Sequence, residues 1–150
     1  MPLLKKIIVE QLIERIGQLQ PHSKASWGKM TVEEMLVHCE AGIQMGMGEL
    51  QSKVRVSQFQ SVIARIVYLY LLPLPKYTPA PPEIDISKKL QQRYPFETAR
   101  ILLVQSIRKI ETIQEDYPFP LHPIFRKLSY KQWGIITFKH LDHHLKQFGV

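Results

Sequence analysis

Three of the six histidines lie within five residues near the end of the chain, at His140, His143 and His144. Histidine is the commonest metal ligand in proteins, because a neutral imidazole offers a lone pair that transition metals prefer. The residues around these histidines have the apolar spacing of a helix. Two histidines four residues apart on a helix can bind one ion, since their Cβ atoms lie about 5–6 Å apart. His140 and His144 are therefore predicted to be two ligands of a metal site.

Helical geometry separates the three histidines. Apolar residues such as Trp133 and Leu141 form one stripe along the segment, and His140 and His144 fall at the edge of that stripe. His143 falls on the other side and is predicted to face water. Two ligands alone make a weak site, so a third must come from another part of the chain.

The third candidate ligand is His38, which lies at the edge of the apolar stripe of a second predicted helix. If the two helices pack side by side, His38, His140 and His144 form a face of three nitrogens with open positions for water or substrate. The alternative is that each is an ordinary hydrogen-bonded core histidine. Glu34, one turn before His38, is a candidate to orient the second ring nitrogen of His38, although it also has the position of a helix cap.

Four further residues have two interpretations each. His122 precedes a proline in a loop, and it either lines the mouth of the pocket or has a structural role. Trp133 either forms a wall of the site or packs in the core. Gly42 and Gly46 are costly inside a helix, so they indicate either a close approach of two helices or open space beside His38.

Helices must position these residues. Apolar residues recur every three or four positions in four segments, and a fifth segment, 57–72, is a nearly continuous apolar run. Capping boxes at Thr31 and Ser129 mark two helix starts. No segment has a convincing strand pattern. We predict an all-α fold, a four-helix bundle with one extra, shorter apolar helix. The predicted helices span residues 4–19, 31–50, 57–72 and 95–116, and from 130 to about 148.

The connections and the length indicate one domain, residues 1–150. Prolines recur between residues 73 and 95, which excludes a long helix and predicts an extended crossover loop. A second proline-rich loop covers residues 117–125. Neither side of the crossover loop is long enough for a separate domain.

Charge, cysteine content and apolar runs limit the classes of partner and the compartment that we expect. The chain has 20 Lys and Arg against 13 Asp and Glu, a net charge of +7, but the cations are scattered along the sequence and nucleic acid is not expected as a partner. The single cysteine, Cys39, excludes an intramolecular disulfide and fits a reducing compartment. No signal-peptide core is apparent, and the apolar run 62–74 is shorter than a membrane span. We expect a cytoplasmic protein with no membrane partner, in which that run is a buried or interface helix.

Motifs across nearly the whole chain resemble the DinB/YfiT-like superfamily of metalloenzymes, in particular a branch whose domain has no assigned function. The loop motif of that branch continues with glycine, where this chain has Arg126. The motifs, which occur in the family's order, are Trp27-Gly28-Lys29-Met30, His122-Pro123-x-Phe125 and His140-x-x-His143-His144-Leu145-x-Gln147-Phe148.

The resemblance implies a four-helix bundle of unusual connectivity that holds a divalent metal ion through His38, His140 and His144. Zinc and nickel are the first candidates, and iron and copper stay open. Related proteins include S-transferases and isomerases in which the metal lowers the pKa of a low-molecular-weight thiol. The resemblance thus implies a metal-dependent, thiol-dependent S-transferase or a hydrolase acting on a small-molecule substrate. The alternative is a non-catalytic, metal-stabilised bundle that serves as a homodimeric binding or scaffold protein, with the apolar residues 62–72 as its self-association surface.

Overall fold

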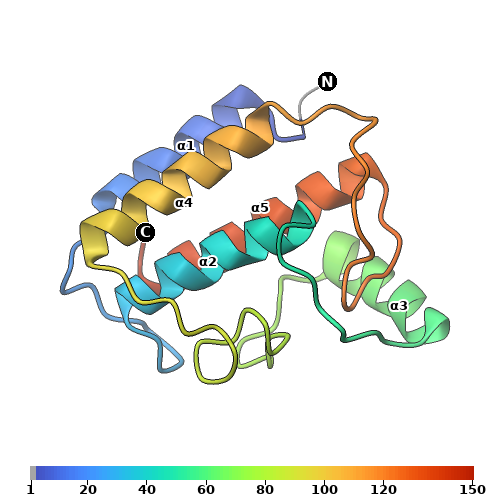
Figure 1. Ribbon diagram of the computed structural model, residues 1–150, viewed down its shortest axis with the longest axis horizontal. Helices are drawn as coiled ribbons and strands as arrows, with labels where there is room; N and C mark the ends of the chain where they lie inside the picture. Colours follow the sequence, from blue (N-terminus) through green and yellow to red (C-terminus); the bar gives the residue numbers. More distant parts are fainter. Residues whose placement is uncertain (1–2) are drawn as a thin grey trace.

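The computed structural model describes residues 3–150, and within that range the chain is all-α, as predicted. Helix α2 packs against α4 and α5, and α1 packs against the same two helices, so the four form a closed ring in which α1 and α2 lie diagonally opposite (Figure 1). The long helices are α1 (Lys6–Gln18), α2 (Val32–Gly46), α4 (Phe96–Glu111) and α5 (Tyr130–Gln147).

The directions of the helices explain the long crossover. α2 and α5 are antiparallel, because His38, Gly42 and Gly46 of α2 meet His144, His140 and Trp133 of α5, whose order along the chain is reversed. α2 and α4 run in the same direction (Figure 1). The chain must therefore return along the bundle between them, and residues 47–95 make this return. The same residues include the short helix α3 (Gln58–Ala64), the π-helix η1 (Arg65–Leu71) and the predicted proline-rich loop.

The predicted helix starts at Thr31 and Ser129 are confirmed. Each hydroxyl accepts from the backbone N–H three residues later, and the side chain of that third residue accepts from the backbone N–H of the cap. The predicted ends are less accurate. α2 stops at Gly46 rather than near residue 50. Gly48, two residues later, has a left-handed φ of 79°, a conformation that ends a helix. α4 likewise ends at Glu111, before the predicted residue 116.

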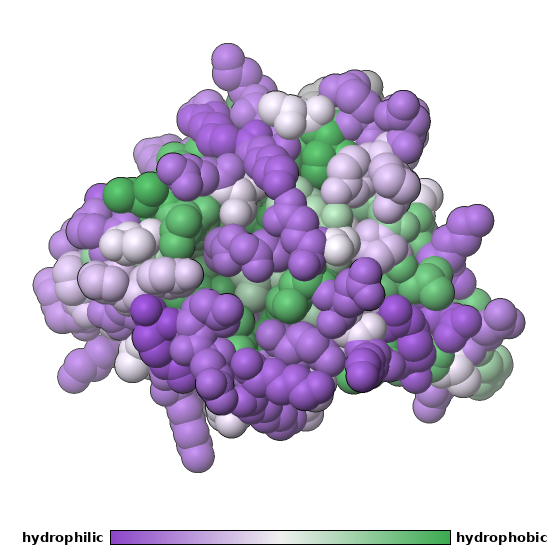
Figure 2. Space-filling view, viewed as in Figure 1, coloured by the Kyte–Doolittle hydropathy of each residue, from purple (hydrophilic) through white to green (hydrophobic). Residues whose placement is uncertain are grey.

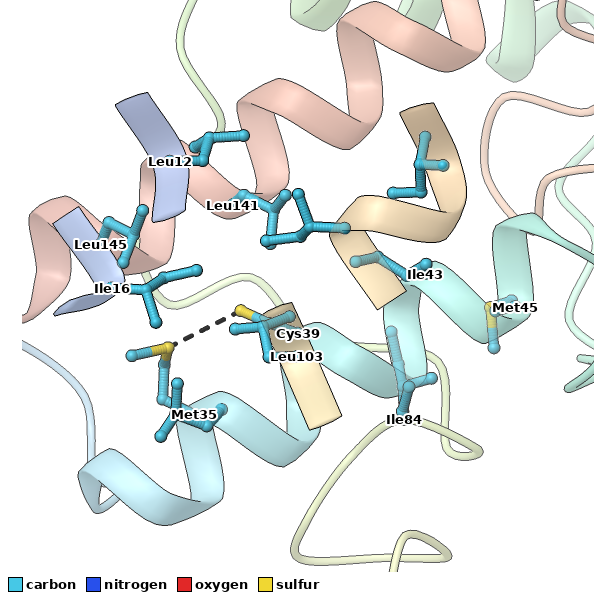
Figure 3. Packing of buried hydrophobic residues seen from close by; sticks show 14 of the residues in the cluster. Leu12, Ile16, Met35, Cys39, Ile43, Met45, Ile84, Leu103, Leu141 and Leu145 are labelled. Carbon is cyan, nitrogen blue, oxygen red and sulfur yellow. Dashed lines mark hydrogen bonds between the residues drawn. The ribbon is translucent and has the colours of Figure 1, made fainter. Parts of the chain in front are cut away.

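The core lies where the four long helices meet, and it contains residues from all of them (Figure 3). Each fully buried leucine or isoleucine contributes about 1.5–3 kcal/mol relative to exposure. Cys39 belongs to this core, its thiol directed at the sulfur of Met35 at 3.7 Å, and burial raises its pKa. The cysteine is thus a packing residue rather than a nucleophile. Buried core residues labelled in Figure 3 include Leu12, Ile16, Met35, Leu103, Leu141 and Leu145.

The predicted apolar helix 57–72 is present, and of its two predicted settings, buried or at an interface, burial does not hold. A capping box at Ser57 starts α3, and the last seven residues are wound as the π-helix η1. Only Ser61 and Leu69 of the two elements are buried. Figure 1 shows α3 standing to one side of the four long helices. No helix within residues 3–150 combines the length and the apolar content that crossing a membrane requires.

Candidate metal centre

The structure brings together the three histidines that the sequence selected. The ring centroids lie 4.9 Å apart for His38 and His140, 4.7 Å for His38 and His144, and 4.9 Å for His140 and His144. One nitrogen from each ring lies within 4.8 Å of the other two. Nitrogens bound to one ion at about 2.1 Å are roughly 3–4 Å apart, so small ring movements bring this set into bonding range. The arrangement can hold one metal ion.

A backbone carbonyl fixes the His38 ring. His38 Nδ1 lies 2.7 Å from Ile84 O, and a carbonyl oxygen can only accept, so Nδ1 carries the hydrogen. The lone pair is then on Nε2, the atom that lies 3.0 Å from His140 Nε2. Carbonyl acceptors commonly orient metal-bound histidines in this way. The crossover loop thus takes part in the site through the backbone of Ile84.

A side-chain amide does the same for His144. Gln147 Nε2 donates to Trp27 O at 2.7 Å, which directs the amide oxygen Oε1 at His144 Nδ1, also at 2.7 Å. Nδ1–H of His144 is therefore the donor, and its Nε2 keeps the lone pair. Two of the three histidines are held in the tautomer that a metal requires.

Close packing of α2 and α5 positions His140. A Cβ placed on Gly42 would lie 2.8 Å from Cε1 of His140 and 3.0 Å from its Nδ1. A Cβ on Gly46, one turn later, would lie 3.2 Å from the ring of Trp133. The close-approach interpretation of the two glycines is therefore correct, and rings from α5 fill the space that a side chain would take.

Replacing Gly42 with alanine is expected to weaken metal binding by roughly 10–100-fold, the range for changes that displace a ligand without removing it. The physical reason is that the new methyl group would displace the His140 ring. Competition against a chromophoric chelator measures the affinity. Gly17→Ala in α1 is the matched control, because a Cβ there meets nothing within 4 Å. Equal affinity in the two variants would show that His140 adapts at no cost.

Burial keeps all three rings neutral. Desolvation lowers the pKa of His38, and it lowers the pKa of His140 well below the usual value, with the neighbouring histidines adding to the effect on His140. Desolvation, with a smaller contribution from His38, lowers the pKa of His144 to about 3. Metals bind the neutral ring, so the site needs no deprotonation at pH 7.

The structure also places two neighbouring residues of the predicted site. Of the two interpretations of Glu34, the cap is correct, because its carboxylate accepts from the Thr31 N–H at 3.0 Å and does not orient His38. His143 does not simply face water. Its ring is half-buried and lies 5.6 Å from the Trp27 ring. It lines the same cavity as His38, His140 and His144. It nevertheless stands outside the set of three converging nitrogens.

His38, His140 and His144, which we call the histidine triad, line a cavity of about 610 Å³. Both interpretations of His122 hold, because it lines this cavity and its Nδ1 also accepts from the backbone N–H groups of Ile124 and Phe125 at 3.1 Å. Trp133 likewise lines the cavity while it stacks on Phe119 in the interior. Its Nε1–H is the one buried side-chain donor or acceptor within residues 3–150 that has no hydrogen-bond partner.

Sequence reasoning missed two residues that orient the ligands. Gln147 had a usable signal, because it follows His144 by three positions and such pairs meet on a helix surface. Ile84 had none, since it acts through its carbonyl oxygen, which every residue has. Only the path of the crossover loop brings that oxygen to His38.

Comparisons of the chain with protein-family models, with curated proteins and with solved structures give no match.

Proposed function

We propose that this chain is a divalent-metal-dependent enzyme that acts on a small molecule as a thiol-dependent S-transferase or a hydrolase. The observation that carries the proposal is the position of three neutral imidazoles, two of them fixed in one tautomer by carbonyl oxygens, at the wall of a cavity of about 610 Å³. A site with three protein ligands keeps positions open for a reactant, as in catalytic rather than structural metal sites.

The cavity suits a small substrate. Its volume lies within the roughly 300–1,000 Å³ typical of ligand pockets. Apolar side chains such as Met30, Phe125 and Ile136 line much of it and exclude water. A divalent ion held by the triad supplies a positive charge that lowers the pKa of a thiol or a water. No side chain of the site is assigned as a catalytic base.

We extend the proposal to the fold family. The DinB/YfiT-like bundle is the fold that the sequence motifs imply, and the long crossover between the parallel helices α2 and α4 agrees with its unusual connectivity. The backbone of Arg126 also supports it. That residue has a left-handed φ of 54°, a conformation that favours glycine, at the position where the family motif has glycine.

The second candidate is a non-catalytic, metal-stabilised homodimer. The exposed apolar residues of α3 and η1 favour it, since such a surface often marks an interface. Metal then adds folding free energy without any reaction.

One experiment separates the two candidates. Protein purified without an affinity tag is stripped with a chelator and reloaded with zinc, nickel, iron or copper. Metal content, melting temperature and turnover are then measured, with low-molecular-weight thiols and a panel of electrophiles and hydrolysable esters as reactants. We expect about one ion per chain and turnover only in the loaded protein. A higher melting temperature without any turnover would favour the homodimer, and no stoichiometric metal would contradict both.

A further inference from the structure

Among the described residues, seven of the 13 exposed large apolar side chains lie on α3, η1 and the residue that follows η1. Its members project to the solvent side, with exposed fractions from 44% for Val62 to 76% for Phe59. The spacing of Phe59, Ile63, Ile66 and Tyr70 is three or four residues, so these side chains share one face. In Figure 2 green surface appears at the lower right, where Figure 1 places α3. We call this surface the α3/η1 face. It comprises Phe59, Val62, Ile63, Ile66, Tyr70, Leu71 and Leu72.

The net positive charge of the chain comes from two segments, one of which contains α3 and η1. Residues 51–82 and 117–141 contain eight of the 20 Lys and Arg and none of the 13 Asp and Glu. The remaining residues carry 12 cations and 13 anions, so the two segments account for the whole net charge of +7. The eight cations of these segments thus stand in two stretches that lack acidic residues.

The fold joins these two stretches. Arg65 Nη1 donates to Lys127 O at 3.0 Å, and Arg126 Nη1 donates to Val56 O at 3.1 Å. Lys139 Nζ donates to the carbonyl of Leu72 at 2.8 Å, which holds a cation at the end of η1. The helix with the exposed apolar side chains is therefore flanked by cations from both stretches. They are Arg65, Arg126, Lys127 and Lys139, together with Lys131, which is next to Gln132, whose side chain donates to Tyr70 Oη at 3.1 Å.

Acidic side chains approach these stretches only at their margins. Glu83 accepts from Ser52 at 2.8 Å and is itself paired with Lys89. Glu115 faces Tyr130. Glu83 follows the first stretch and Glu115 precedes the second, so the stretches themselves carry eight positive and no negative side chains.

We propose that the α3/η1 face docks onto the surface of a membrane that contains anionic lipid. Its apolar side chains enter the boundary between headgroups and acyl chains, and the surrounding cations face the lipid phosphates. The expectation of no membrane partner rested on the lack of a spanning segment, and surface docking needs none.

The charge around the face favours an anionic lipid surface over a second copy of the chain or nucleic acid. A second copy docked through the same face would bring two sets of these cations together, which costs free energy. Nucleic acid would meet the cations but would leave the exposed phenylalanine, isoleucine and leucine side chains without apolar partners. An anionic lipid surface offers an apolar environment to the exposed side chains and negative charge to the cations that flank them.

Flotation with vesicles tests the proposal. The purified full chain is mixed with vesicles of phosphatidylcholine alone or of phosphatidylcholine with phosphatidylglycerol, at low and high salt. We expect it to float with the anionic vesicles only, and less at high salt. Ile66→Ser should weaken binding roughly tenfold through lost apolar burial. Ile101→Ser is the matched control, because Ile101 is 52% exposed on α4 and Ile66 is 51% exposed.

A second variant tests the charges separately. Lys127→Gln with Lys131→Gln should lower the partition coefficient by roughly fivefold per lysine, while Lys24→Gln, an exposed lysine outside the two stretches, should not. Circular dichroism melting checks that each variant is folded. Failure to float with anionic vesicles overturns the proposal, as does binding that neither variant changes. A concentration-dependent dimer in sedimentation, broken by Ile66→Ser and without vesicle binding, would assign the face to a second copy.

Discussion

Replacing His140 with alanine is expected to remove stoichiometric metal from the purified protein. The variant keeps two of the three converging nitrogens, one on each of two helices, and loses the ring that packs against Gly42. Changes around a metal ligand typically cost 10–100-fold in affinity, so loss of a ligand itself should cost more than about 100-fold. Elemental analysis of untagged protein gives the stoichiometry, and chelator competition gives the affinity.

The matched control is His143→Ala. It removes a half-buried histidine from the same helix and the same cavity, but from outside the set of three nitrogens. We expect it to keep about one ion per chain. An unchanged metal content in His140→Ala would contradict the site as described. An equal loss of metal in the two variants would contradict it as well.

Acid is expected to destabilise the metal-free protein at a pH well above the range in which carboxylates titrate. Folding lowers the pKa of His144, and also that of His122, to about 3, largely through burial, while an unfolded histidine titrates near 6.5. Between these values the unfolded chain binds more protons than the folded one. The free energy of unfolding therefore falls as pH drops below about 6.5, and it continues to fall until the folded pKa is reached.

The size of the effect is measurable. At pH 4.5, two pH units below the unfolded value, His144 alone should cost about 2–3 kcal/mol, against a total stability of about 5–15 kcal/mol for a typical domain. His38 and His140 add in the same direction. Urea titrations of the metal-free protein from pH 7 to 4.5 measure it.

The control for this titration is His144→Gln, which removes one of the buried titrating rings and should flatten the dependence on pH. His22→Gln should leave the curve unchanged, since His22 is exposed in the folded protein. A free energy of unfolding that stays constant from pH 6.5 to 4.5 would show that the rings are accessible to protons in the folded state.

Local rules explain the part of the site that the sequence predicted. His140 and His144 share a face because one turn of helix separates them, and the two capping boxes form from residues three positions apart. His38 was predicted as a ligand in the same way, from its position at the edge of the apolar stripe of α2. Its meeting with the other two required only that α2 and α5 be neighbours.

Longer-range features escaped prediction for physical reasons. The carbonyl of Ile84 reaches His38 through the path of a loop, and no side-chain pattern encodes that path. His143 was misplaced because helical phase places a residue relative to its own helix only, whereas Trp27, from a loop, covers it. Hydropathy alone likewise did not distinguish burial from exposure in α3 and η1, where the apolar side chains face outward.

The contact between Gly42 and His140 also bears on how such sites are recognised in other chains. The ring of His140 occupies the volume of the side chain that Gly42 lacks, so the glycine belongs to the site as much as the ligands do. A signature restricted to the three histidines is therefore incomplete. The useful pattern is a histidine followed four positions later by glycine, together with a distant pair of histidines four apart. A relative that keeps the ligands but has a bulkier residue at the glycine position must either separate its two helices or lose the ion.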